Sequence, residues 1–248
     1  MEKLLKTGFL GCLALLPVSC WLQDDFISDL QILPAVTAPP SQRTTPADVF
    51  NVSLNGVNYR VEPQFDYDLH GLVVSLRHHD GDRMVHRLWN DHLNVADVCV
   101  VWGRNATDLD LNDYDFSSGE FTCFVRTGDF GAWNRFDMHG LSNNHLITED
   151  LYLRDQIESL RIGDQIRIRG WLASYSHGDG FLRGTSTTRT DEGNGACETI
   201  YVKSFQVLSS MGNGWRPVFE FSLLGLFGFA ILWTVGVMRG TFRHQAAD

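Results

Sequence analysis

The chain has 248 residues, of which 44% are apolar and 12% aromatic, and it carries 20 Lys and Arg against 30 Asp and Glu. This composition excludes disorder over most of the length. Once the two apolar ends are set aside, roughly 170 residues remain, which is enough for one compact core.

Negative charge is concentrated in the central part of the chain. Residues 1–20 and residues 210–248 each carry a net charge of +1, which leaves −12 for residues 21–209 in a chain whose total is −10. A domain this acidic repels a phosphate backbone unless its charges are strongly segregated. We therefore expect no nucleic acid among its partners.

The N-terminal segment has the layout of a bacterial export signal. Lys3 and Lys6 come before roughly a dozen apolar or small residues, and the stretch is short for a membrane span. Its last five residues, LPVSC, resemble the lipobox of bacterial lipoproteins, although Pro17 stands where that family prefers Leu. We expect residues 1–20 to be an export signal. Lipid attachment at Cys20, ordinary cleavage and an uncleaved signal anchor are the alternatives for its fate.

A second apolar segment lies near the C-terminus. Residues 221–238 form an uncharged run of 18 residues, which as a helix would reach about 27 Å, long enough to cross a membrane. Arg239 and Arg243 follow this run, and positive residues favour the cytoplasmic side. We predict a transmembrane helix over residues 219–238, a cytoplasmic tail over 239–248, and a main domain on the periplasmic side of a bacterial inner membrane. A buried core helix is the alternative, and apolar residues on all faces argue against it.

Proline content separates the signal from the folded domain. Residues 34–48 contain four of the seven prolines together with Ser and Thr, which is typical of a linker. We predict a linker over residues 21–48 and an exported domain over residues 49–209. The domain begins with apolar alternation on both sides of Asn55-Gly56, which predicts a β-hairpin with a type I′ turn.

The rest of the domain has mostly the pattern of β-strands. Thr148 is placed to be the N-cap of one helix, and Gly163 to end it. Leu151, Ile157 and Leu160 repeat on one face of this helix. Further strands are predicted at residues 69–76, 95–102, 120–126, 165–175 and 198–208.

These elements predict a mainly β fold. A helix that leads directly into the strand IRIRG is typical of the fourth strand of an OB-type barrel, a small five-stranded Greek-key barrel. We expect an OB-like β-barrel in which residues 120–126 form the third strand and the hairpin lies on the outside. An SH3-like barrel or a small sandwich is the alternative.

Three motifs of the domain resemble a known group of proteins. They are SNNHLI over residues 142–147, IGDQIRIRGWL over residues 162–172 and TSTTRTDEGNGACE over residues 185–198. Similar motifs occur in exported bacterial proteins of unknown function, and the similarity covers about residues 65–208. The resemblance implies a protein of the bacterial cell envelope and carries no activity over to this chain.

Three cysteines belong to the domain, namely Cys99, Cys123 and Cys197. An exported compartment permits disulfides, and Cys99 and Cys123 lie in predicted strands that could be neighbours. The alternative is three buried free cysteines. Because the number is odd, at least one thiol is free or pairs with another molecule.

One group of residues is a candidate for nucleophilic chemistry. It comprises His145, Arg189, Asp191, Cys197 and Glu198. A nucleophilic cysteine needs a histidine within hydrogen-bond reach. In the structural alternative, Asp191 and the glycines of the loop make turns, Arg189 pairs with an acid, and His145 bonds backbone groups of an Asn-rich turn.

The sequence predicts no cofactor and no metal. The segment HHDGDRMVH at residues 78–86 lacks the ligand spacing of known zinc sites. The acidic segment at residues 108–115 fails the EF-hand pattern because Asp113 and Gly119 stand at the sixth and twelfth positions. No phosphate loop or dinucleotide fingerprint is present.

We therefore expect a membrane-anchored extracytoplasmic binding or scaffold domain that joins other envelope proteins in a membrane complex. Aromatic residues near strand ends favour such a partner surface; they are Trp89, Trp102, Trp133, Phe136, Trp171 and Phe181. The alternative is an envelope enzyme, a hydrolase or thiol-dependent enzyme that uses the 185–198 loop and His145. A third alternative is docking of the C-terminal helix through Gly225, Gly228 and Gly236.

Overall fold

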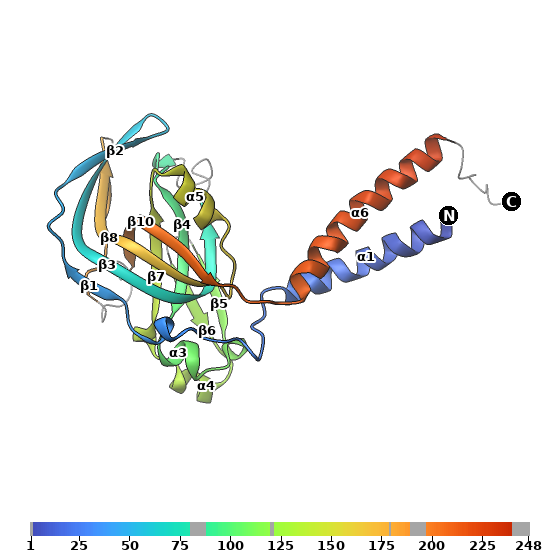
Figure 1. The fold of residues 1–248 in the computed structure, drawn as a ribbon, viewed down its shortest axis with the longest axis horizontal. Coiled ribbons are helices and arrows are strands. Elements are labelled where there is room, and N and C mark those ends of the chain that lie inside the picture. The colour runs from blue at the N-terminus through green and yellow to red at the C-terminus, as the bar shows by residue number, and fades with distance from the viewer. Residues whose placement is uncertain (1, 80–87, 120–121, 179, 189–196, 240–248) are drawn as a thin grey trace. The chain divides into compact units, whose positions relative to one another are not determined.

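The computed structural model describes residues 2–79, 88–119, 122–178, 180–188 and 197–239 (Figure 1). The chain divides into two compact units. One comprises residues 28–211 and is called the β-domain here. The other comprises residues 1–27 together with residues 212–248, and is called the helical unit.

The β-domain is built on one eight-stranded sheet and one small sheet. The large sheet contains β1 (Ser41–Thr44), β2 (Phe50–Leu54), β3 (Val57–His78), β4 (Asn94–Val101), β7 (Leu141–Ile147), β8 (Gln165–His177), β9 (Phe181–Arg183) and β10 (Glu198–Ser209). The small sheet pairs β5 (Asp115–Ser118) with β6 (Cys123–Arg126). Within the described residues, three α-helices, α3 (Arg104–Thr107), α4 (Phe130–Arg135) and α5 (Leu151–Glu158), and two 3-10 turns, η2 (Leu111–Asp113) and η3 (Met138–Gly140), lie between these strands, and a further 3-10 turn, η1 (Pro34–Thr37), precedes β1.

Five strands pair in a path that returns to its start. β3 pairs with β4, β4 with β7, β7 with β10, β10 with β8, and β8 with β3 again. The β7–β10 pair is parallel and the other four are antiparallel. The parallel pair joins β7, which carries the SNNHLI motif, to β10, which follows the 185–196 loop.

The hairpin begins the pairing. Asn55 and Gly56 form its turn with φ values of 50° and 79°, the left-handed backbone that this dipeptide tolerates. Its second arm does not end at Val61, because β3 runs without interruption to His78. The two strands predicted separately at residues 57–61 and 69–76 are therefore one.

The third strand of the central five was predicted wrongly. Residues 123–126 form β6 of the small sheet, and residues 141–147 take the expected place as β7. Ser142, Asn143, Asn144 and His145 are polar, so the segment lacks the apolar alternation that marks a half-buried strand. All four are nevertheless buried.

The helix α5 begins two residues later than predicted. Asp150, rather than Thr148, is its N-cap, and its carboxylate accepts hydrogen bonds from the backbone N–H groups of Tyr152 and Leu153. Ile157 is buried as expected, whereas Leu151 is 70% exposed. The apolar face of the helix is therefore narrower than its sequence indicates.

Part of the predicted linker belongs to the β-domain. Residues 41–44 form β1, which pairs with β3 so that Ser41 lies opposite Asp68. Val36, in η1, is fully buried. These residues therefore contribute to the fold although their composition is that of a linker.

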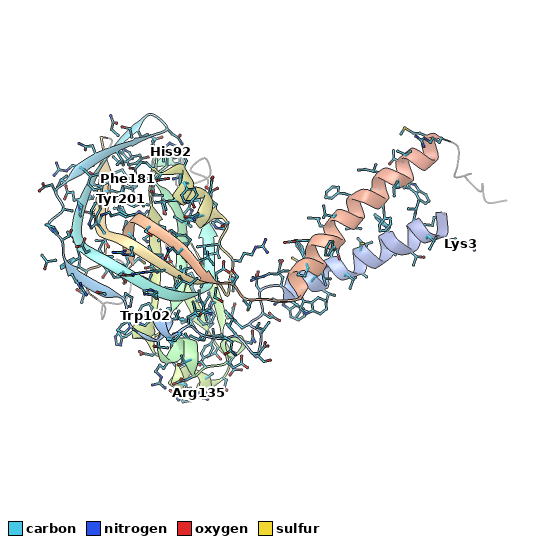
Figure 2. All side chains as sticks on the ribbon, in the orientation of Figure 1. Lys3, His92, Trp102, Arg135, Phe181 and Tyr201 are labelled. Carbon is cyan, nitrogen blue, oxygen red and sulfur yellow. A yellow bond between two sulfur atoms is a disulfide. The ribbon has the colours of Figure 1, made fainter. Side chains whose placement is uncertain are left out.

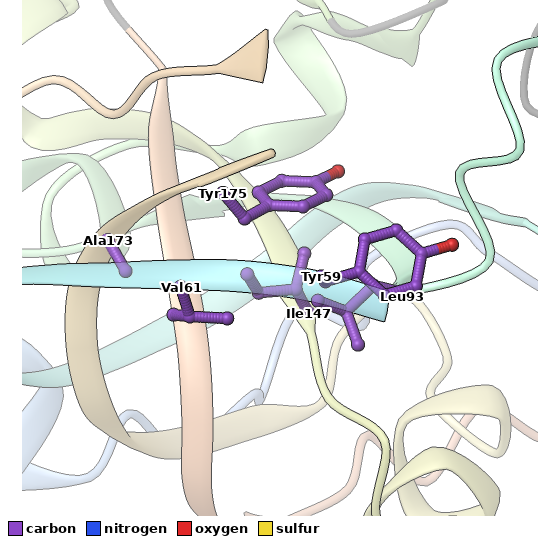
Figure 3. Packing of buried hydrophobic residues seen from close by; sticks show 6 residues of the cluster. All are labelled: Tyr59, Val61, Leu93, Ile147, Ala173 and Tyr175. Atoms are coloured by element: carbon purple, nitrogen blue, oxygen red, sulfur yellow. The ribbon is translucent and has the colours of Figure 1, made fainter. Parts of the chain in front are cut away.

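A cluster of buried residues lies where the hairpin meets β8 (Figure 3). Its members are Tyr59, Val61, Leu93, Ile147, Ala173 and Tyr175. Phe181 and Tyr201, labelled in Figure 2, are partly buried and pack against it. The hairpin thus adds to the core, because its residues Phe50, Val52 and Leu54 pack against the same cluster.

The helical unit contains two apolar helices that run side by side (Figure 1). They are α1 (Glu2–Leu22) and α6 (Trp215–Met238), and both are long and apolar enough to cross a membrane. The C-terminal helix begins at Trp215, four residues before the predicted span. Residues 240–248, most of the predicted tail, lie outside the described residues.

Candidate thiol site

The site begins with a carboxylate and an imidazole on neighbouring strands. Asp97 of β4 lies directly opposite His145 of β7 in the antiparallel register. The Nδ1 atom of His145 is 2.5 Å from Oδ1 of Asp97. Asp97 is fully buried and His145 is 3% exposed, so water does not screen this pair.

Asp97 is held by further polar groups. Its second oxygen, Oδ2, is 3.2 Å from Nε2 of His79, and the amide of Asn94 donates to Oδ1 at 3.2 Å. Burial alone would raise the pKa of Asp97, but hydrogen bonds from His145 and His79 lower it far below its usual range. Asp97 is therefore a carboxylate at neutral pH.

Cys197 is the other partner of the His145 side chain. The parallel register places Thr199 opposite His145 and Glu198 opposite Asn144, which brings Cys197 next to Asn143 of β7. Cys197 hydrogen-bonds the His145 side chain. Cys197 forms no disulfide and is partly buried.

These neighbours change the charge of His145. Burial lowers its pKa, but hydrogen bonds to Asp97 and Cys197 and the charge of Asp97 raise it more, so that the pKa is about 9. Arg183 acts in the opposite direction. His145 is therefore an imidazolium at neutral pH, in contact with a carboxylate and a thiol.

The backbone around Cys197 is fixed by the chain that enters the loop. The N–H of Ser186 donates to the Cys197 carbonyl at 2.9 Å. The N–H of Thr199 donates to Oγ1 of Thr185 at 2.9 Å, and the Thr199 hydroxyl donates to the Gly184 carbonyl at 2.8 Å. The backbone at Cys197 and Thr199 is thus bonded to residues 184–186, which precede the 189–196 segment in the sequence.

Asn143 is a second neighbour of the thiol. Its Nδ2 atom is 3.6 Å from the sulfur of Cys197 and donates to it. Asn143 is 5% exposed. The sulfur therefore has hydrogen-bonding partners on two residues of β7, Asn143 and His145, whose side chains share one face of the strand.

The structure brings together some of the residues selected from the sequence. His145 and Cys197 are in contact. Glu198 is buried at the start of β10, opposite Asn144, and successive strand residues face opposite sides of a sheet, so its side chain does not share the face of Asn143 and His145. Arg189 and Asp191 lie outside the described residues. His145 is part of a strand, so its prediction as a residue of an Asn-rich turn is wrong.

Asp97 is the site residue that sequence reasoning missed. A signal was present, because Asp97 is the one charged residue in the strand NVADVCVV and all eight residues of this strand are buried. A buried charge requires a partner. His79 was noted only as part of a segment with metal-ligand residues, and residues 80–86 of that segment lie outside the described residues.

Within the described ranges, no three or more His, Cys, Asp or Glu side chains are arranged to hold a metal ion. The acidic segment at residues 108–115 has local structural roles in its described contacts. Asp110 accepts a hydrogen bond from the N–H of Asn112 at 3.0 Å and caps η2.

The strand that carries Asp97 is also cross-linked. Cys99 forms a disulfide with Cys123 of β6, with the two Cα atoms 5.8 Å apart. The hydroxyls of Ser75 and Ser118 are 2.7 Å apart and join β3 to β5. The small sheet is thus joined to β4 by the disulfide and to β3 by the contact between the two serine hydroxyls.

No protein-family model matches the chain, and no curated protein matches its sequence.

Proposed function

We propose that this protein is a membrane-anchored enzyme of the bacterial cell envelope that uses Cys197 as a nucleophile in acyl transfer, most simply the hydrolysis of an ester or amide. One observation carries the proposal. The His145 side chain hydrogen-bonds both the Asp97 carboxylate, through Nδ1, and the Cys197 side chain. Thiol-dependent hydrolases use this arrangement of nucleophile, base and orienting acid.

Each residue has a role that follows from its contacts. The Asp97 carboxylate fixes the orientation of the imidazole and stabilises its positive charge. His145, hydrogen-bonded to Cys197, holds the proton that the thiol loses when its sulfur acts as the nucleophile. Asn143 donates to the same sulfur and limits its movement.

The reaction would proceed in two steps. The thiol proton resides on His145, the Cys197 sulfur forms a bond to the substrate carbonyl carbon, and the bond to the leaving group breaks as that group takes the proton from His145. A thioester remains. Water then gives a proton to His145 and attacks the thioester carbon, and the carboxylic acid and the free thiol are released.

The location is proposed from other features. The disulfide between Cys99 and Cys123 suits an oxidising compartment such as the periplasm. The two apolar helices suit anchoring in the inner membrane, with the tail from residue 239 in the cytoplasm. The closed path of five strand pairings, with α5 between β7 and β8, supports an OB-like β-barrel as the scaffold.

A binding or scaffold role within an envelope complex is the second candidate. It is favoured by a half-buried aromatic cluster in which the rings of Trp171 and Tyr201 stack 5.7 Å apart and Phe50 packs on both. Lys203 lies 4.1 Å from the centre of the Trp171 ring. A groove of about 640 Å³ lies beside them; its lining includes Arg43, Asp66, Asp68, Arg169 and Lys203. Aromatic and charged side chains of this kind suit a protein partner.

Thiol reactivity distinguishes the two candidates. The full chain in detergent would be treated with iodoacetamide, and the alkylation of each cysteine followed by peptide mass spectrometry. The enzyme proposal requires Cys197 to react faster at neutral pH than an unstructured cysteine, and the His145→Gln variant to lose this advantage. Cys20, which is exposed, provides an internal control in the same sample.

Substrate turnover is the second test. A set of p-nitrophenyl esters of different acyl chains would be offered to the wild type, to Cys197→Ala and to Cys20→Ala. Hydrolysis that disappears only in Cys197→Ala supports the proposal. Cys197 that reacts no faster than Cys20, together with equal hydrolysis by all three proteins, would overturn it in favour of the binding role.

A further inference from the structure

The two apolar helices pack closely through glycines. A Cβ atom at Gly225 of α6 would lie 2.6 Å from the sulfur of Cys12 of α1. A Cβ atom at Gly8 of α1 would overlap the ring of Phe229 of α6. In a membrane, where no hydrophobic force holds helices together, such close packing is the main source of helix association.

Polar contacts join the two helices where α1 ends and α6 begins. The side-chain amide of Asn213 donates to the carbonyl of Leu22 at 2.8 Å and to that of Asp25 at 2.9 Å. Arg216 is 8% exposed, donates to the Gln23 carbonyl at 3.1 Å and lies 3.6 Å from the carboxylate of Asp24. The acceptors are the carbonyl of Leu22, the last residue of α1, and those of Gln23 and Asp25, which follow it.

A charged contact joins the helices near the chain termini. The Nζ atom of Lys6 lies 5.2 Å from the centre of the Trp233 ring, within the range of a cation–π interaction. Contacts thus extend from Lys6 to Leu22 along α1 and, in the reverse order, from Trp233 of α6 to Asn213, just before that helix begins. The two helices are therefore antiparallel over most of their length.

From these contacts we infer that α1 stays in the mature protein and forms an antiparallel two-helix membrane hairpin with α6. The inference rests on the membrane part of the proposed function and is independent of the thiol chemistry. Lys3 and Lys6 near the N-terminal end of α1 and Arg239 after α6 favour the cytoplasmic side for both chain ends. An antiparallel hairpin requires the same sidedness.

Retention of α1 excludes acylation at Cys20. Cleavage before Cys20 would remove Lys6, Gly8 and Cys12, and with them the packing described above. The helix continues through Cys20 to Leu22. Ser19 is fully buried, and its hydroxyl donates to the Leu15 carbonyl at 2.8 Å. Of the alternatives for residues 1–20, the inference selects the uncleaved anchor.

The intact mass of the protein tests retention. The full-length gene would be expressed in a bacterium, the membranes isolated, and the purified chain measured by mass spectrometry. A membrane protein whose mass includes residues 2–22 supports the hairpin. A membrane protein that starts at Cys20 with added acyl chains, or at a later residue, overturns the hairpin alone. A full-length chain in the soluble fraction overturns the membrane part of the proposed function as well.

Matched glycine variants test the pairing itself. Gly8→Leu and Gly225→Leu should separate the helices, whereas Gly11→Leu and Gly228→Leu are the controls because nothing lies within 4 Å of either position. The readout is maleimide labelling of Cys12 in detergent. We expect labelling several-fold faster in Gly8→Leu and Gly225→Leu and unchanged in the controls. Equal rates in all four variants would overturn the pairing.

Discussion

The carboxylate of Asp97 lies between two imidazoles, and its closer contact, 2.5 Å, is with Nδ1 of His145. An Asp97→Asn change keeps the size of the side chain but removes the charge that stabilises the imidazolium. By analogy with the orienting acid of hydrolase triads, we expect any activity that depends on Cys197 to fall by on the order of 10³-fold or more. We also expect the free energy of unfolding to fall by about 3 kcal/mol, because a buried charge loses its partner.

Turnover of the best p-nitrophenyl ester and urea denaturation would measure the two effects. Asp115→Asn is the control, because Asp115 is an exposed carboxylate on β5. If Asp97→Asn retained the wild-type rate, the orienting role of Asp97 would be wrong even if the protein were less stable.

The raised pKa of His145 predicts how stability depends on pH. In the folded state the pKa of His145 is about 9, whereas the ordinary pKa of a histidine, as in the unfolded chain, is 6.5. A group with a raised pKa in the folded state stabilises the fold fully below the unfolded pKa, and this contribution is lost as pH rises through the folded pKa. We therefore expect unfolding free energy to decrease by about 3 kcal/mol between pH 6.5 and 9.

Urea denaturation across this pH window would measure the decrease. His145→Gln should flatten the profile between pH 6.5 and 9. His139→Gln should leave it unchanged, because the His139 side chain is 55% exposed. A wild-type profile that is flat over the window would contradict an imidazolium at His145.

The parts of the fold that were predicted correctly depend on local signals. Asn55-Gly56 specifies its turn by backbone conformation alone, so the hairpin was visible in the sequence. The strand β7 was missed because its stability comes from partners distant in sequence, β4 and β10. One of its buried polar groups is bonded across the strands: the amide of Asn144 donates to the Val98 carbonyl at 3.1 Å.

Dependence on partners distant in sequence also explains why only part of the site was predicted. His145 and Cys197 could be selected by residue type, because a nucleophilic cysteine is commonly activated by a histidine base. Their contact depends on the parallel β7–β10 pairing, which no short-range pattern indicates. Asp97 could have been found because it is the one charged residue of a strand that is otherwise uncharged, and a buried charge requires a partner.

The disulfide predicts a loss of stability on reduction. Cys99 and Cys123 are 24 residues apart in sequence, and closing a loop of that length stabilises a fold by about 3 kcal/mol in the chain-entropy model. A Cys99→Ser/Cys123→Ser variant should therefore unfold at lower urea concentration by a corresponding amount. Cys197→Ser is the control for replacing a cysteine that has no disulfide. If the double variant were as stable as the control, the cross-link would not contribute to the fold.

A buried hydroxyl supplies the last prediction. The Tyr175 hydroxyl donates to the carboxylate of Asp91, 2.9 Å from each oxygen, and both residues are fully buried. Tyr175→Phe removes a donor to a charged acceptor without changing the ring, so we expect the unfolding free energy to fall by about 2 kcal/mol. Tyr152→Phe, at a 69% exposed position, should have almost no effect.

Because Tyr175 belongs to the cluster in which the hairpin packs on β8, hydrogen exchange at the amides of β2 should also accelerate in Tyr175→Phe. An unchanged unfolding free energy would show that Asp91 does not need this hydroxyl.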